Sequence, residues 1–136
     1  MDARQIIAKL NSDTEANLIS AIYSVDESFS NNIEVILRLR QLVCHESCDV
    51  REISIMRLAC RLGDGAIKSI LEENVFREVD ELTFSASVRG LVCLSFSSLK
   101  EREVLLSMLT TRLPEISSNE RRKVINQAVE DLSKAR

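Results

Sequence analysis

Glycine and proline are scarce in this chain, which holds only three glycines and one proline in 136 residues. Together they make up about 3% of the sequence, against roughly 12% in an average protein. Sandwiches, barrels and doubly wound α/β folds need these residue types at many turns. The sequence therefore predicts an all-α protein.

Apolar residues recur at spacings of three and four along almost the whole chain, as they do on one face of a helix. No stretch of eighteen apolar residues occurs, so no membrane-spanning segment is expected. We expect about eight helices, over residues 2–10, 13–25, 31–44, 49–62, 65–78, 83–97, 99–113 and 118–134.

Local signals mark several ends of these helices. A short polar residue followed three positions later by Glu is typical of a capping box at a helix start. Gly63 is expected to end one helix in the left-handed conformation, and Pro114 to end another. The five candidate capping residues are Ser12, Asn31, Asp49, Ser98 and Ser117.

A repeat is visible when every second expected helix is aligned. Positions 14, 50, 88 and 121 then correspond, which gives a period of 33 to 38 residues. Short connections make consecutive helices antiparallel neighbours, and a helix pair with this period is typical of an α-solenoid. We expect one domain over residues 1–136, a solenoid-like stack of about four antiparallel helix pairs. The alternative is a compact eight-helix bundle.

One segment carries a family resemblance. Residues 49–64 read DVREISIMRLACRLGD, which resembles the second helix of a HEAT repeat, with its Asp-Val-Arg start and its Leu-Gly-Asp end. Residues 87–92 are a weaker second copy. The resemblance implies a HEAT-like fold, and it implies a ladder between adjacent repeats that would involve Asp49, Arg51 and Arg89. It implies no activity.

The charge of the chain is mildly negative, at −3, and it is unevenly spread. The densest acidic stretch is relieved only by Arg77, and it could attract a basic partner. The alternative is a solvated helix end and loop. The five carboxylates of this acidic stretch are Glu72, Glu73, Glu78, Asp80 and Glu81.

Three further residues are candidates for binding a partner. Arg57 and Arg61 are four positions apart on the side of the expected helix 49–62 that faces away from its core stripe. Two arginines at this spacing can hold a carboxylate or a phosphate. The alternative is two solvated arginines whose stems cover apolar surface. Tyr23, the only tyrosine, is either an interface anchor or a core residue.

Little in the sequence points to bond-making chemistry. Cys44, His45 and Cys48 form the one candidate metal cluster, but structural zinc sites usually draw on two separated ligand pairs. The chain starts without the features of a signal peptide, so we expect a cytoplasmic protein whose four cysteines are reduced. With a single histidine and no phosphate-binding loop or nucleophile motif, we expect no cofactor, no metal and no enzymatic activity.

These expectations favour a module that binds another protein. In size, charge and helical architecture the chain is similar to the immunity proteins that bacteria pair with secreted toxins, including those of contact-dependent growth inhibition. That resemblance implies a cytosolic inhibitor that occludes a toxin domain, often a nuclease. The alternatives are an adaptor or regulatory HEAT-like scaffold, and a HEAT-like nucleic-acid-binding protein.

The nucleic-acid alternative has residue-level evidence against it. HEAT-like DNA glycosylases use a strongly basic face and aromatic side chains, whereas this chain is acidic overall and lacks tryptophan. The sequence leaves open which protein is the partner, which face binds it and what the oligomeric state is.

Overall fold

The computed structural model describes residues 2–77 and 79–134, and over these residues it contains eight α-helices and no strand. The predicted all-α class and number of helices are thus confirmed. The chain divides into two compact units, residues 1–67 and residues 68–136. Single-domain organisation stays a prediction. Within the described part of the chain, no helix is both long enough and apolar enough to span a bilayer.

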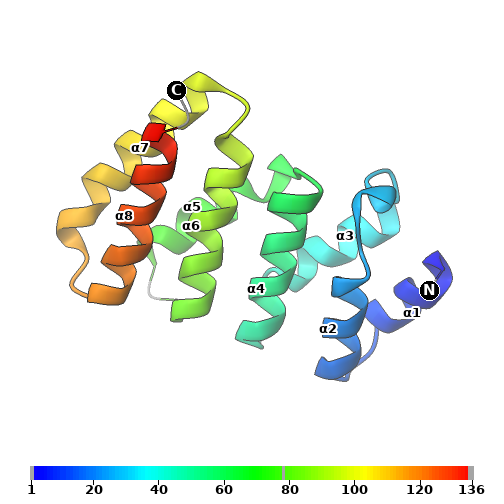
Figure 1. Ribbon diagram of the computed structural model, residues 1–136. Helices are drawn as coiled ribbons and strands as arrows, with labels where there is room; N and C mark the ends of the chain where they lie inside the picture. Colours follow the sequence, from blue (N-terminus) through cyan, green and yellow to red (C-terminus); the bar gives the residue numbers. More distant parts are fainter. Residues whose placement is uncertain (1, 78, 135–136) are drawn as a thin grey trace. The chain divides into compact units, whose positions relative to one another are not determined.

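Unit 1 is built from two helix pairs. Helix α1 packs against α2 and α3 against α4, and the pairs meet through α1 with α3 and α2 with α4. Figure 1 shows α2 and α4 side by side in one layer of this unit and α1 and α3 in the other. The helices are α1 (Ala3–Leu10), α2 (Glu15–Tyr23), α3 (Ile33–Leu42) and α4 (Cys48–Met56), with 3₁₀ turns at Glu27–Phe29 and Gly65–Ile67.

The starts of α3 and α4 are capped by residues one and two positions from the expected ones, and no side chain caps the start of α2. Asn32 accepts a hydrogen bond from the Val35 amide at the start of α3. Ser47 does the same for Val50 at the start of α4. A capping box between Asp2 and Gln5, which the sequence analysis did not predict, begins α1.

A single π-helical turn, Arg57–Arg61, follows α4 directly. The Leu62 amide donates to the Arg57 carbonyl over 3.0 Å, a bond between residues five apart. We expected an ordinary α-helix to residue 62, and this wider turn corrects that expectation. The turn ends at Gly63, whose φ of +62° confirms the predicted left-handed conformation. Single π turns are rare and often lie at functional positions.

Asp64, just after this glycine, is tied back to α3. Arg40 donates two hydrogen bonds to its carboxylate, of 2.8 and 2.9 Å. These bonds lower the pKa of Asp64 below its usual value, with a smaller contribution from the Ala66 amide and against the opposing effect of burial. The connection that follows the π turn is therefore held to α3 by a charged pair.

Unit 2 is organised around its second helix. Helix α6 packs against each of the other three, and α7 packs against α8. Nine of the residues of α6 are buried, among them Phe84 and Leu91. The helices are α5 (Lys68–Phe76), α6 (Glu81–Ser95), α7 (Leu99–Arg112) and α8 (Asn119–Lys134), with a 3₁₀ turn at Leu113–Glu115.

Three buried polar residues of unit 2, Asn74, Thr83 and Ser87, are joined by hydrogen bonds. The side-chain amide nitrogen Nδ2 of Asn74 donates to Ser87 Oγ over 3.0 Å, and Ser87 Oγ donates to the Thr83 carbonyl over 2.7 Å. Because buried polar groups cost free energy unless they are paired, this chain of bonds lets α5 and α6 bury polar residues between them. At the start of α7, Ser98 accepts from the Glu101 amide, as the capping pattern predicted.

Candidate functional site

A hollow of about 200 Å³ lies in unit 1, between the end of α2 and the π turn that follows α4. We call its lining the α2–α4 face. It includes Tyr23, Arg57 and Arg61, so the structure brings Tyr23 together with the arginine pair, which the sequence analysis proposed separately from it. The full lining is Tyr23, Glu52, Ile53, Met56, Arg57, Cys60 and Arg61.

The centre of the α2–α4 face is a stack of a guanidinium on an aromatic ring. The Arg57 guanidinium carbon lies 5.4 Å from the centroid of the Tyr23 ring, within the range of a cation–π interaction. Tyr23 is 60% exposed, which excludes the alternative that it fills the core. The stack presents a large, partly apolar surface to solvent.

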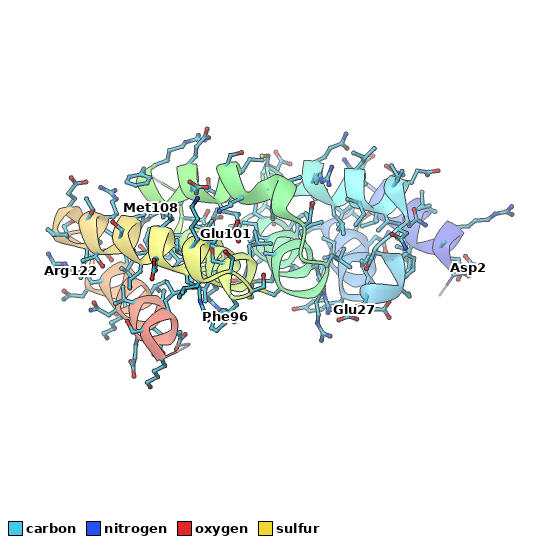
Figure 2. All side chains as sticks on the ribbon, turned by 90° about the horizontal axis from the view of Figure 1, so that it is seen from above. Asp2, Glu27, Phe96, Glu101, Met108 and Arg122 are labelled. Carbon is cyan, nitrogen blue, oxygen red and sulfur yellow. The ribbon has the colours of Figure 1, made fainter. Side chains whose placement is uncertain are left out.

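Arg61 has a partner of its own in the same unit. Its Nη1 lies 3.4 Å from Glu27 Oε1, and the two side chains are 56% and 62% exposed. Figure 2 shows Glu27 at the surface. An ion pair this exposed contributes little to stability, so Glu27 is easily exchanged for a carboxylate of a partner. The joint clamp that the spacing of Arg57 and Arg61 suggested stays a prediction.

A second carboxylate, Asp26, lies just before Glu27. It accepts hydrogen bonds from the Ser28 hydroxyl and from the Ser28 amide. These two bonds lower its pKa most, and the positive charges of Arg57 and Arg61 lower it further. Asp26 therefore stays ionised and adds negative charge beside the two arginines.

Unit 1 as a whole is acidic, with ten carboxylates and seven arginines and lysines among residues 1–67. Several of the carboxylates lie on α2, on α4 or just after α2. Glu15 accepts from Ser47 Oγ, which joins the first turns of the two helices. Asp49 is exposed and Glu52 half-buried. The α2–α4 face thus combines a Tyr–Arg centre with surrounding negative charge.

Two carboxylates of the acidic stretch in unit 2, Asp80 and Glu81, accept hydrogen bonds within the unit. Asp80 is the N-cap of α6 and accepts from the Thr83 amide and hydroxyl, over 2.8 and 2.6 Å. Glu81 accepts from Arg121 Nε over 2.9 Å. Arg121 also donates to the Val79 carbonyl. Asp80 and Glu81 therefore hold the start of α6 and its connection in place.

The other carboxylates of this stretch are more open. Glu73 lies 3.8 Å from Arg77 in an exposed pair, and Glu72 is half-buried on α5. Glu78 lies outside the described residues. The role predicted for this stretch in binding a partner stays a prediction, and Glu72 and Glu73 are the described members that could still serve it.

The candidate metal cluster is not assembled. Cys44 is exposed and Cys48 half-buried, and both are free thiols. Nδ1 of His45 accepts a hydrogen bond of 3.0 Å from the Ser47 amide, so the imidazole helps to shape the connection before α4. Across the described residues, no group of three histidine, cysteine or acidic side chains could hold a metal ion.

The other two cysteines depart from what we expected. Cys60 and Cys93 are each disulfide-bonded, so the prediction of four reduced thiols is wrong for these two. Their neighbours in the sequence gave no sign of this, because bonding depends on which sulfur atoms the fold brings close. Cys60 therefore brings no thiol to the α2–α4 face.

Sequence reasoning missed four residues of this region: Glu52, Met56, Asp26 and Glu27. A signal for the first two was present. Glu52 and Met56 are four positions apart, in a helical row next to the row that carries Arg57 and Arg61. Glu27 lies in a 3₁₀ turn that the apolar periodicity did not reveal.

The HEAT resemblance predicted a ladder through Asp49, Arg51 and Arg89. Within unit 1, Arg51 Nη1 donates to the carbonyls of His45 and Glu46 over 2.7 and 3.0 Å. Arg51 thus braces the connection between α3 and α4. Arg89 forms no ion pair or hydrogen bond over residues 2–77 and 79–134, so the ladder does not extend to it; the part that would involve Asp49 and Arg51 stays a prediction.

Comparison of the chain with protein-family models, with curated proteins and with solved structures found no match. What the α2–α4 face binds must therefore be inferred from its own chemistry. Tyrosine, arginine and methionine are residue types enriched where proteins meet, and Tyr and Arg are among those whose truncation most weakens binding.

Proposed function

We propose that this chain is a non-enzymatic protein-binding module, a HEAT-like stack of helix pairs. We propose further that it is a cytosolic immunity protein that binds and occludes a cognate toxin, a nuclease domain. The observation that carries the proposal is the Tyr23–Arg57 stack, which leaves Tyr23 60% exposed. An aromatic ring held at the surface by a guanidinium is a ready anchor for a partner.

Charge indicates the kind of partner. The stack lies beside Asp26 and Glu27 in a unit with ten carboxylates and seven basic side chains. A nuclease needs a basic cleft to bind nucleic-acid phosphates, and an acidic surface complements such a cleft. Complementary charge also speeds association, which favours a fast-acting inhibitor.

The helix packing of unit 1 supports the HEAT-like part of the proposal. The corresponding helices of its two pairs contact each other, α1 with α3 and α2 with α4. Small-angle X-ray scattering of the full chain tests whether such stacking continues through all four pairs. A stack predicts an elongated scattering profile, and a compact bundle predicts a globular one.

Co-expression tests the immunity role. The partner to use is any nuclease-like domain that a reading frame adjacent to this gene encodes, expressed with and without the chain in cells whose growth that domain arrests. We expect the wild-type chain to restore growth. A chain that binds the toxin domain without restoring growth would point to an adaptor, and a chain that does not bind it would remove the immunity proposal.

Purified proteins then test the α2–α4 face. Truncation of a binding anchor costs about 2 kcal/mol or more, so we expect Tyr23→Ala and Arg57→Ala each to weaken binding at least thirtyfold by calorimetry. Arg4→Ala is the control, because Arg4 is an exposed arginine of the same unit, on α1, and lies outside the α2–α4 face. If the control and Arg57→Ala weaken binding equally, the α2–α4 face is not the interface.

A further inference from the structure

Unit 2 has a larger hollow, of about 420 Å³, between α6 and α8. The two helices run in the same direction within this unit (Figure 1). We call the hollow the α6–α8 groove. It is lined by Ser85, Arg89, Val92, Cys93, Glu120, Lys123, Val124, Gln127, Ala128 and Asp131.

The floor of the α6–α8 groove is apolar and its rim is charged. Val92 and Ala128 are only 8% and 4% exposed, and Val124 is half-buried. Arg89 projects from α6, and Lys123 projects from α8; both are exposed. A small apolar floor with a few polar groups at its edge is typical of a site for a small ligand, and such sites have volumes of roughly 300–1,000 Å³.

The positive charge of Arg89 is not neutralised. Over residues 2–77 and 79–134, no carboxylate forms an ion pair with its guanidinium and no acceptor takes a hydrogen bond from it. The carboxylates of the groove have partners on their own helix. Asp131 accepts from Gln127 over 2.9 Å, and Glu120 lies 3.6 Å from Lys123.

We propose that the α6–α8 groove binds a small amphipathic carboxylate, a short aliphatic chain with one anionic head. The head pairs with the Arg89 guanidinium, whose planar donors match a carboxylate. The aliphatic chain covers Val92, Val124 and Ala128. Lys123 adds a weaker attraction, because it is 75% exposed and already lies near Glu120. This site is separate from the protein-binding role proposed for the α2–α4 face.

A small ligand fits this groove better than a docked helix does. A helix that lies in a groove anchors itself through a row of apolar side chains, at positions i, i+3, i+4 and i+7. The floor of the α6–α8 groove offers three apolar residues in a single hollow. One short aliphatic chain suffices to cover them.

Titration of octanoate into the ¹⁵N-labelled full chain tests the proposal by NMR. We expect saturable shifts of the amides of Val92, Val124 and Ala128, and an affinity that falls as salt is added because an ion pair is involved. Octanol carries the same aliphatic chain without charge and octylammonium carries the opposite charge. Both should bind at least fivefold more weakly than octanoate.

Variants test the role assigned to Arg89. Arg89→Gln removes a charged hydrogen-bond donor from the site, so it should weaken octanoate binding about tenfold. Lys123→Gln should weaken octanoate binding less. Lys134→Gln on α8 is the control, because Lys134 lies outside the groove and pairs with Glu130. All three variants remove an exposed charge, and unchanged thermal unfolding will show that each remains folded.

Three outcomes would overturn the proposal. The first is octanoate binding that does not saturate at the groove, and the second is equal binding of octanol and octanoate. The third is an Arg89→Gln variant with wild-type affinity. If octanoate does not bind, and an acidic amphipathic helical peptide shifts the same amide signals to saturation, the groove is a protein-docking surface instead.

Discussion

Arg40 and Asp64 form the best-defined charged pair of unit 1, with two hydrogen bonds of 2.8 and 2.9 Å between guanidinium and carboxylate. The Asp64 side chain is 11% exposed. Because its pKa is lowered in the folded state, the pair stabilises the fold above the unfolded-state pKa of about 3.9. That stability is lost as the pH falls through the lower, folded-state pKa.

We therefore expect Asp64→Asn to lower the free energy of unfolding by about 2 kcal/mol at pH 7. Urea unfolding at several pH values between 7 and 2 measures this difference. The gap between wild type and variant should shrink as Asp64 becomes protonated in the acidic part of the series. Glu27→Gln, in the exposed pair with Arg61, should change stability by less than about 0.5 kcal/mol. A gap that is independent of pH would contradict the role given to this carboxylate.

Two nearby glycines make a matched test of backbone strain. Gly63→Ala should cost about 1 kcal/mol, because Gly63 has a φ of +62° that side chains with a Cβ disfavour. Gly65→Ala meets nothing within 4 Å and has no positive φ, so it should be neutral or slightly stabilising. Thermal unfolding of the two variants decides the matter. Equal effects would show that the left-handed turn does not limit stability.

Leu58 lies in the core of unit 1 and is 0% exposed. Leu58→Asp places an unpaired charge there and should cost more than about 4 kcal/mol, enough to unfold a domain of ordinary stability. Circular dichroism and heat denaturation measure the loss. Leu37→Asp on α3 is the control, since Leu37 is 50% exposed. If Leu58→Asp melted like wild type, the assignment of this helix face to the core would be wrong.

Within the acidic stretch, the structure predicts unequal effects on stability. Asp80→Ala removes the N-cap of α6 and should cost about 1–2 kcal/mol. Glu73→Ala removes only an exposed pair with Arg77 and should cost less than about 0.5 kcal/mol. Chemical denaturation of both variants compares them. An equal loss would mean that the capping bonds of Asp80 contribute nothing.

The helices were predictable because the regular spacing of apolar residues shows which face of each helix is buried. The Ser98 cap and the left-handed Gly63 followed from residue type in the same way. The π turn at Arg57–Arg61 was not predictable. A π turn differs from an α-helical turn in the carbonyl that accepts the hydrogen bond from each amide. The same side chains can occur in both kinds of turn.

The candidate site was predictable as residue types but not as an arrangement. Tyr23 and Arg57 are 34 positions apart, and they meet only because α2 packs on α4. The capping role of Asp80 was open to inference from its position before α6, but the sequence analysis treated it only as part of an acidic stretch that either binds a basic partner or is solvated. The Asp26–Glu27 pair was missed because a short 3₁₀ turn leaves no apolar period.

Tyr23 is the only tyrosine of the chain, which has no tryptophan. The tyrosine absorbance and fluorescence of the native protein therefore report from a single place, next to the Arg57 guanidinium. Any macromolecule that covers this ring or displaces the guanidinium will change that signal, without a label and without an engineered fluorophore. The fold thus carries its own optical sensor on the surface where recognition is expected.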